Sequence, residues 1–341
     1  MSTTVTPQLE PDVLRSRIER FRKVQSEIVT QVRRVIVGQE EVLEQVMIGL
    51  FVGGHCLITG LPGTAKTLLV RTMAQTLGLV FKRIQFTPDL MPSDITGTDI
   101  IEEDNTTGRR TWTFVPGPIF ANVLLADEIN RTPPKTQSAL LEAMQERACT
   151  VRGHNYALPS PFFVLATQNP IELEGTYALP EAQLDRFLFN TVLDYLNADE
   201  ELKVVDLTTT TAVAQAEPIT NAQEILDFQQ LVRMVPIGES VARHAIDMVR
   251  ATRSRDETAP DFVQKYVNYG GSVRAAQFLV LSAKARALMK GRYHVTYEDI
   301  RALYIPVLRH RILLNFHAES DRLKQDDILK RVLEWKPAPR D

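Results

Sequence analysis

The chain has 341 residues, of which 44% are hydrophobic and 24% are charged, and its net charge is -3. This composition describes a soluble globular protein, and the length suggests two domains with an extra arm. The slight negative charge argues against a dedicated nucleic-acid binder, although a local basic patch stays open, and two cysteines are too few for a disulfide framework or a zinc site.

The beginning of the chain gives no sign of export. Residues Met1 to Pro11 have neither a basic start nor an apolar stretch, so they do not resemble a signal peptide. No apolar run approaches the length that spans a bilayer. We therefore expect a cytoplasmic protein without membrane insertion.

Residues 1–36 are predicted to form an N-terminal helical arm. From Leu9 to Val35, apolar residues recur at steps of three and four, which predicts one long helix. Basic residues occupy its other face, and a solvated helix face is the favoured interpretation of them. Gly38 breaks this helix, and residues 40–51 form the next one.

Residues 37–196 are predicted to form an α/β nucleotide-binding core. Apolar strands alternate with helical patterns, which is typical of a parallel sheet covered on both faces. The five predicted strands are His55–Thr59, Val80–Phe86, Val123–Asp127, Phe162–Gln168 and Phe187–Leu193.

Two β-hairpins interrupt this alternation. Thr98–Val115 turns at Asn105–Gly108, and Ala148–Leu158 turns at Arg152–Asn155. Trp112 lies in the first hairpin, where it could pack or touch a substrate.

The last third of the chain is predicted to be an all-helical domain over residues 221–341, joined to the core by a linker over residues 197–220. Helical patterns cover 221–235, 239–255, 272–290, 296–314 and 321–335. The six histidines do not cluster at metal-ligand spacing. The basic cluster Arg309–Arg311 is interpreted as a solvated helix face.

A glycine-rich loop between the first core strand and the following helix predicts a phosphate-binding site. Its backbone N–H groups and the helix N-terminus would face an anion, Lys66 would contact the outer phosphates, and the Thr67 hydroxyl could bind Mg²⁺. Ala65 stands where a glycine is expected, and we expect it to have helical dihedral angles. The residues predicted to bind nucleotide here are Gly60, Leu61, Pro62, Gly63, Thr64, Ala65, Lys66, Thr67 and Leu68.

Polar side chains follow two other predicted strands. Asp127 and Glu128 end a buried strand, which puts both acids at the carboxyl edge of the sheet, where ligands of open α/β sheets bind. Asp127 would hold Mg²⁺ and Glu128 would activate a water molecule. Asn169 follows the next strand, and its amide can hydrogen-bond a phosphate and water, although Asn-Pro is also a frequent turn.

Arg186 closes a short helix before the last core strand. Its guanidinium could neutralise the charge on a γ-phosphate in a neighbouring subunit. A structural pair with Asp185 or Glu181 is the alternative. Arg131 follows the two acids closely enough to reach a subunit interface, but a loop or capping role is equally good.

Together, the motifs at Gly60–Thr67, Leu124–Arg131, Ala166–Pro170 and Leu179–Phe187 resemble the MoxR family of AAA+ ATPases. The resemblance implies Walker A at Gly60–Thr67, Walker B at Asp127 and Glu128, and sensor 1 at Asn169. It also implies an arginine finger at Arg186 and sensor 2 at Arg274, where Arg274 would reach the γ-phosphate of its own subunit. Gln85 matches a position that holds the Walker B glutamate away from water, and the hairpins match inserts that line a central pore.

The resemblance further implies Mg²⁺-dependent ATP hydrolysis, with ATP between core and lid, in a closed ring that is a hexamer. It implies chaperone-like remodelling or metal insertion into partner proteins, often ones with a von Willebrand factor A domain. Arg109, Arg110 and Arg152 keep a nucleic-acid motor as an alternative, although the net charge makes nucleic acid an unlikely partner. A nucleotide-gated scaffold is a third alternative, which the intact Asp127 and Glu128 disfavour.

Overall fold

A parallel β-sheet forms the centre of the first domain in the computed structural model, which describes residues 11–61, 63–103, 110–169, 175–209 and 216–338. Its five strands lie in the order β2-β5-β8-β1-β9, and each neighbouring pair is parallel. They are β1 (His55–Gly60), β2 (Phe81–Gln85), β5 (Val123–Asp127), β8 (Phe163–Gln168) and β9 (Phe187–Leu193). The predicted α/β core is confirmed, since each predicted strand is present within one residue at either end.

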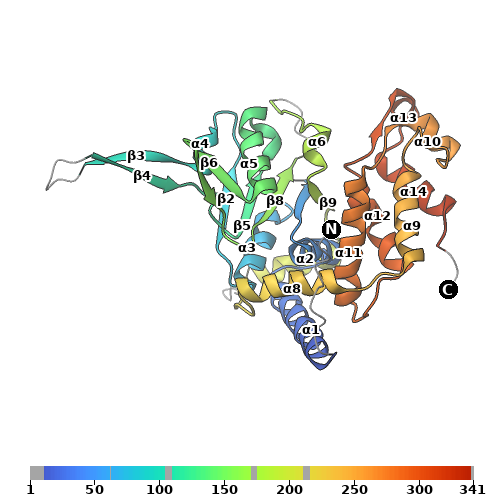
Figure 1. The fold of residues 1–341 in the computed structure, drawn as a ribbon, viewed down its shortest axis with the longest axis horizontal. Helices are drawn as coiled ribbons and strands as arrows, with labels where there is room; N and C mark the ends of the chain where they lie inside the picture. The colour runs from blue at the N-terminus through green and yellow to red at the C-terminus, as the bar shows by residue number, and fades with distance from the viewer. Residues whose placement is uncertain (1–10, 62, 104–109, 170–174, 210–215, 339–341) are drawn as a thin grey trace, which may run out of the picture.

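Helices cover both faces of this sheet (Figure 1). Alternate strand residues point to opposite faces, so Leu125 and Leu165 join one hydrophobic core, whereas Leu124 and Val164 join the other. The first core includes α1 (Pro11–Arg33), α2 (Glu40–Val52) and α3 (Lys66–Thr76). The second includes α4 (Pro92–Thr96) and α5 (Pro134–Glu146).

Helix α1 is fastened to the rest of the protein by aromatic packing. Phe21 makes edge-to-face contacts with Phe51 of α2 and with Phe228 of the helical domain, at ring-centroid distances of 4.8 and 5.1 Å. Arg20 of α1 also forms an ion pair of 2.7 Å with Glu224. The N-terminal helix therefore joins the core and the helical domain. Among the described residues, no helix has the length and apolar character needed to cross a membrane.

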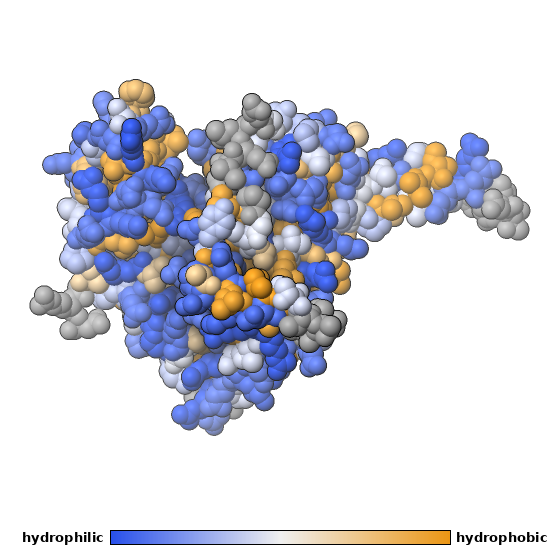
Figure 2. Space-filling view, turned by 180° about the vertical axis from the view of Figure 1, so that it is seen from behind, coloured by the Kyte–Doolittle hydropathy of each residue, from blue (hydrophilic) through white to orange (hydrophobic). Residues whose placement is uncertain are grey.

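Both predicted hairpins are present, and the first extends well away from the body of the molecule (Figures 1 and 2). The strands are β3 (Gly97–Glu103) with β4 (Arg110–Pro116), and β6 (Ala148–Val151) with β7 (His154–Ala157). The predicted turn at 105–108 lies outside the described residues. Trp112 is 60% exposed.

The two hairpins contact each other through ring and charge contacts. Phe114 stacks on Tyr156 at 4.0 Å, and the guanidinium of Arg152 lies 4.2 Å from the centroid of the Trp112 ring. Arg152 also lies 3.8 Å from Asp99. The hairpins therefore pack as one unit.

The helical C-terminal domain is confirmed, with one exception. A short antiparallel ribbon of β10 (Val267–Tyr269) and β11 (Leu313–Leu314) interrupts the helices, because pairing between distant segments overrides their local helical pattern. A further helix, α7 (Ala198–Thr208), lies within the predicted linker. The helices of the domain are α8 (Ala222–Met234), α9 (Glu239–Arg250), α10 (Asp261–Tyr266), α11 (Val273–Met289), α12 (Tyr297–Leu308), α13 (Phe316–Ser320) and α14 (Gln325–Trp335).

The interpretation of Arg309–Arg311 as a solvated helix face is wrong. The side chain of Arg311 is 1% exposed, and His310 is buried. Arg309 donates to the carbonyl oxygen of Asn190 at 3.0 Å. This segment instead joins the helical domain to strand β9.

Two buried histidines make the stability of the protein depend on pH. Nδ1 of His55 accepts a hydrogen bond from the Val164 N–H at 3.0 Å, and Nε2 lies 3.2 Å from the Met144 carbonyl oxygen, so the neutral ring is fully satisfied. Burial lowers the pKa of His55 to about 4 and lowers the pKa of His310 as well. The unfolded chain therefore binds more protons than the folded protein below an ordinary histidine pKa of about 6.5.

Stability is therefore expected to fall as the pH drops through this window. His55 alone should cost about 2 kcal/mol of unfolding free energy between about pH 7 and about pH 5. Urea unfolding at the two pH values measures the loss, and the His55→Gln protein should lose less. An equal pH dependence in the parent and in this variant would contradict the assignment.

Candidate functional site

The predicted phosphate-binding loop joins β1 to α3 and has two residues in the left-handed region. Gly63 has φ +80° and Ala65 has φ +59° and ψ 24°. The expectation of helical dihedral angles at Ala65 is therefore wrong. This conformation costs an alanine about 1 kcal/mol, and successive turns of this kind direct backbone N–H groups into an anion-binding concavity. Pro62 lies outside the described residues.

A cavity of about 490 Å³ opens over this loop, and we call it the polar cavity because charged and polar side chains take part in its lining. Lys66 donates to the carbonyl oxygen of Gly60 at 2.6 Å. Burial lowers the pKa of Lys66, and the charges of Asp127 and Glu128 oppose that shift. The described residues that line the cavity are Gly63, Thr64, Ala65, Lys66, Thr67, Leu68, Asp127, Glu128 and Asn169. The fold therefore brings most of the predicted site residues to the carboxyl edge of the sheet.

Asp127 is held from two sides at the end of β5. The Thr167 hydroxyl donates to Oδ1 at 2.6 Å, and Nη2 of Arg83 donates to Oδ2 at 2.6 Å. The sequence pattern gave no reason to single out Thr167. Arg83 could have been noticed because it is a charged residue inside a predicted buried strand.

Glu128 has a left-handed backbone with φ +57°. Its N–H donates to the Thr167 hydroxyl at 2.8 Å. Its Oε2 accepts hydrogen bonds from Nε2 of Gln85 at 2.8 Å and from Nη1 of Arg131 at 3.0 Å. Gln85 thus contacts the glutamate that it was expected to hold, and Arg131 contacts the same carboxylate.

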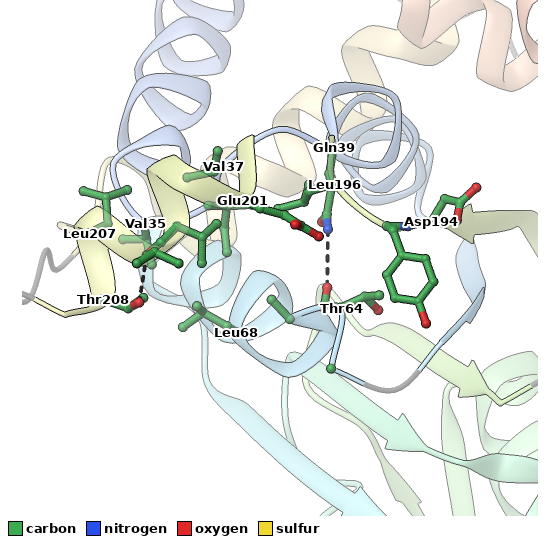
Figure 3. A pocket seen from close by; sticks show the side chains of 16 residues that line it. Val35, Val37, Gln39, Thr64, Leu68, Asp194, Leu196, Glu201, Leu207 and Thr208 are labelled. Atoms are coloured by element: carbon green, nitrogen blue, oxygen red, sulfur yellow. Dashed lines mark hydrogen bonds between the residues drawn. The ribbon is translucent and has the colours of Figure 1, made fainter. Parts of the chain in front are cut away.

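An apolar cavity of about 350 Å³ adjoins the polar one, since both are lined by Gly63, Thr64, Ala65 and Leu68. Figure 3 shows its walls, which come from the segment after α1, the glycine loop with the start of α3, the segment after β9, and helix α7. Nε2 of Gln39 donates to the Thr64 carbonyl oxygen at 3.3 Å. The amide oxygen of Gln39 is buried and has no hydrogen-bond partner among the described residues.

This apolar cavity is a part of the site that sequence reasoning missed. Val35, Ile36 and Val37 line it, although the sequence pattern assigned this region to a helix end and a break. The signal was present, because three successive β-branched residues before a glycine favour an extended segment over a helix. Among the described residues, none from helices α8 to α14 lines this cavity.

Arg186 and Arg274 line a separate cavity of about 210 Å³ together with Arg147. Nη1 of Arg186 donates to the carbonyl oxygen of Leu141 at 2.6 Å. Arg274 forms an ion pair of 3.4 Å with Asp185. The structure thus brings the two predicted arginines together, away from the glycine loop.

The position of this arginine-lined cavity follows from the sheet topology. Arg186 directly precedes β9, whose first residue pairs with His55, the first residue of β1. The glycine loop follows the other end of β1, which has six residues and so spans roughly 16 Å at about 3.3 Å per step. The expectation that Arg274 reaches the nucleotide of its own subunit finds no support in this arrangement, because Arg274 lies at the opposite edge of the sheet.

Comparisons with known proteins agree with this architecture. Residues 55–189 match the ATPase family associated with various cellular activities (AAA), and residues 259–332 match the AAA lid domain. A crystal structure of a candidate ATPase from Cytophaga hutchinsonii superposes with a TM-score of 0.89 and is 40% identical, covering 96% of this chain and 99% of that one.

Curated relatives extend the match along almost the whole chain. Chaperone MoxR1 of Mycobacterium tuberculosis is 41% identical over 91% of this chain and 81% of its own length. The uncharacterised protein YeaC of Bacillus subtilis is 40% identical over 89% and 92%, and the protein MoxR of Methylorubrum extorquens is 29% identical over 94% and 96%. The fold, the arrangement around the glycine loop and these relatives lead to one conclusion: the chain belongs to the MoxR family of AAA+ ATPases.

Proposed function

We propose that this protein hydrolyses ATP to ADP and phosphate in the two adjoining cavities. The shared loop carries this proposal: the glycine loop borders an apolar cavity and also the cavity that Lys66, Asp127 and Glu128 line. The base would occupy the apolar cavity, where the unpaired amide oxygen of Gln39 can accept a hydrogen bond from the amino group of adenine. The phosphates would lie over the glycine loop.

The residues of the polar cavity also fit Mg²⁺. This ion prefers oxygen ligands and usually keeps one or two protein ligands beside phosphate and water. Thr67 and Asp127 would hold it, and Thr167 already orients the Asp127 carboxylate. When bound, the ion would neutralise charge on the phosphate oxygens.

The chemistry proposed is direct attack of water on the γ-phosphate. Glu128 would accept the proton of the attacking water, and Asn169 would hydrogen-bond the γ-phosphate and the water. Lys66 would stabilise the charge that develops on the phosphate oxygens. Because Gln85 and Arg131 both bind Oε2 of Glu128, release of these contacts would free the carboxylate for catalysis.

We infer that the site is completed by a second subunit. Arg186 and Arg274 share one cavity at the edge of the sheet opposite to the glycine loop, so both are placed to serve a neighbour and not their own nucleotide. An interface in which one face donates arginines and another accepts them is heterologous, and its repetition gives a ring when the rotation between subunits closes. By resemblance the ring would be a hexamer.

For the cellular role, we propose chaperone-like remodelling or metal insertion in cytoplasmic partner proteins, with von Willebrand factor A domains as the expected adaptor. A relative named as a chaperone supports this role. The hairpins disfavour the nucleic-acid motor. Arg110 is paired with Glu103 at 2.9 Å, and Arg152 lies near Asp99 and covers Trp112, so acidic neighbours offset the charge of both cations. Arg109 lies outside the described residues.

Dilution tests the shared site. ATP turnover per subunit is expected to fall steeply below the concentration at which sedimentation shows loss of the assembly. Addition of DNA should leave turnover unchanged. Full turnover in verified monomers would refute the shared site, and a stimulation by DNA that weakens with salt would favour the nucleic-acid motor.

A further inference from the structure

Arg311 carries a buried guanidinium at the junction between the helical domain and the core. It follows α12, and its side chain is 1% exposed. Nε donates to Oδ1 of Asp185 at 2.8 Å, Nη1 to the Leu188 carbonyl oxygen at 3.2 Å, and Nη2 to the Asp185 carbonyl oxygen at 3.1 Å. Further hydrogen bonds reach the carbonyl oxygens of Val307 and Phe187.

Asp185 connects this buried group to Arg186 and Arg274 of the arginine-lined cavity. Its Oδ2 lies 3.4 Å from Nη1 of Arg274 and accepts a hydrogen bond from the Ser272 hydroxyl at 3.2 Å. Asp185 also directly precedes Arg186 in the chain. A single carboxylate, fixed by Arg311, therefore contacts one arginine and sets the backbone from which the other extends.

The chemistry of the guanidinium suits this task. Burial lowers the pKa of Arg311 to about 10, and the hydrogen bond and charge of Asp185 oppose that shift. A planar group with fixed donors sets the orientation of every carbonyl and carboxylate that it binds. Because all its partners except the Val307 carbonyl lie at or just before the start of β9, Arg311 fixes the direction in which the Asp185–Arg186 turn points.

The two preceding residues provide a comparison, because they contact the same strand, β9. Arg309 donates to the Asn190 carbonyl oxygen at 3.0 Å and pairs with Asp326, and His310 lies 3.0 Å from the Phe187 carbonyl oxygen. These contacts also fasten the helical domain to β9. Among these three residues, Arg311 is the one whose side chain binds Asp185 in the described part of the chain.

We propose that Arg311 is a positioning residue that orients Arg186 and Arg274 through Asp185, and that it therefore acts on the nucleotide of the neighbouring subunit. The inference rests on the proposed role of Arg186 in a shared site. It adds that each helical domain moves together with the arginines that its subunit donates, because both are fastened to the same turn.

A subunit-mixing experiment tests this inference. The Arg311→Gln protein alone should lose about 10²-fold in turnover at unchanged ATP affinity, as expected when a catalytic group is displaced by about 1 Å. Excess Glu128→Gln protein hydrolyses ATP only slowly but presents correctly held arginines, and its own turnover, measured alone at the same concentration, is subtracted. In mixed assemblies the turnover per Arg311→Gln subunit should recover at least tenfold, approaching that of the parent. The Arg309→Gln protein, as the matched control, should turn over ATP at close to the parental rate without mixing.

Two further arms separate the possible failures. Arg186→Ala mixed with Glu128→Gln tests the shared site itself, and its failure to recover would overturn the proposed function and this inference together. Recovery of Arg186→Ala without recovery of Arg311→Gln would overturn the positioning role alone. Turnover at the parental rate by unmixed Arg311→Gln would also overturn the positioning role alone.

A second variant covers the case in which Arg311→Gln does not fold. Asp185→Asn alters the partly exposed partner, and it should show the same loss and the same recovery on mixing. Thermal unfolding and binding of a fluorescent ATP analogue check each variant beforehand. Absence of recovery in a folded, nucleotide-binding Asp185→Asn protein would count against the proposal.

Discussion

The Arg186→Ala protein is expected to turn over ATP about 10³–10⁵-fold more slowly than the parent while it still binds ATP. The reason is the separation of the two halves of the site. Arg186 lies at the amino edge of the sheet, and the residues of the polar cavity lie at its carboxyl edge. Removal of the guanidinium should therefore leave nucleotide binding in the same subunit intact.

Steady-state turnover and binding of a fluorescent ATP analogue, measured at a concentration that keeps the assembly intact, check this expectation. Arg243→Ala is the matched control, since it removes an exposed arginine that pairs with Glu239 on the surface of α9. Equal losses in the two variants would indicate a general effect of charge. A loss of ATP affinity in isolated Arg186→Ala subunits would place this arginine in its own nucleotide site.

The Glu128→Gln protein is expected to bind ATP and to hydrolyse it about 10²–10⁴-fold more slowly. The amide keeps the shape of the side chain and cannot accept the proton of the attacking water. The contacts that hold the backbone of Glu128, including the bond from its N–H to Thr167, remain in the variant. ATP should therefore stay bound, so that this form also serves as bait for a partner protein.

Single-turnover hydrolysis and analysis of the bound nucleotide after gel filtration test this prediction. Glu319→Gln on the surface of α13 provides a control outside the cavity. Hydrolysis at the parental rate by Glu128→Gln would mean that another group activates the water. Loss of ATP binding would mean that the carboxylate mainly supports the shape of the site.

The strands and the glycine loop could be predicted from the sequence because local patterns determine them. An apolar strand that ends in Asp127 and Glu128 must place both acids at one edge of a parallel sheet, and the structure does so. The partners of these acids were only partly predictable. Gln85 was expected, but Arg83 and Thr167 reach them across neighbouring strands whose register is not visible in the sequence.

The parts that sequence reasoning missed depend on packing between distant segments. The apolar cavity needs α7 to lie against Val35–Val37, and the burial of Arg311 needs the helical domain to dock on β9. The location of Arg274 has the same origin. Its place in a helical motif suggested a contact with its own nucleotide, whereas docking of the domain puts it beside Arg186.

The stacked hairpins have a mechanical consequence. The β3–β4 hairpin follows the strand that ends in Gln85, and the β6–β7 hairpin follows α5, which begins shortly after Glu128. Phe114 and Tyr156 join the two at their bases. Strand β3 spans roughly 20 Å at about 3.3 Å per residue, so a rotation of about 5° at its base displaces its far end by about 2 Å. A change in the Gln85–Glu128 contact that rotated this base would therefore produce its largest displacement at the far end of β3.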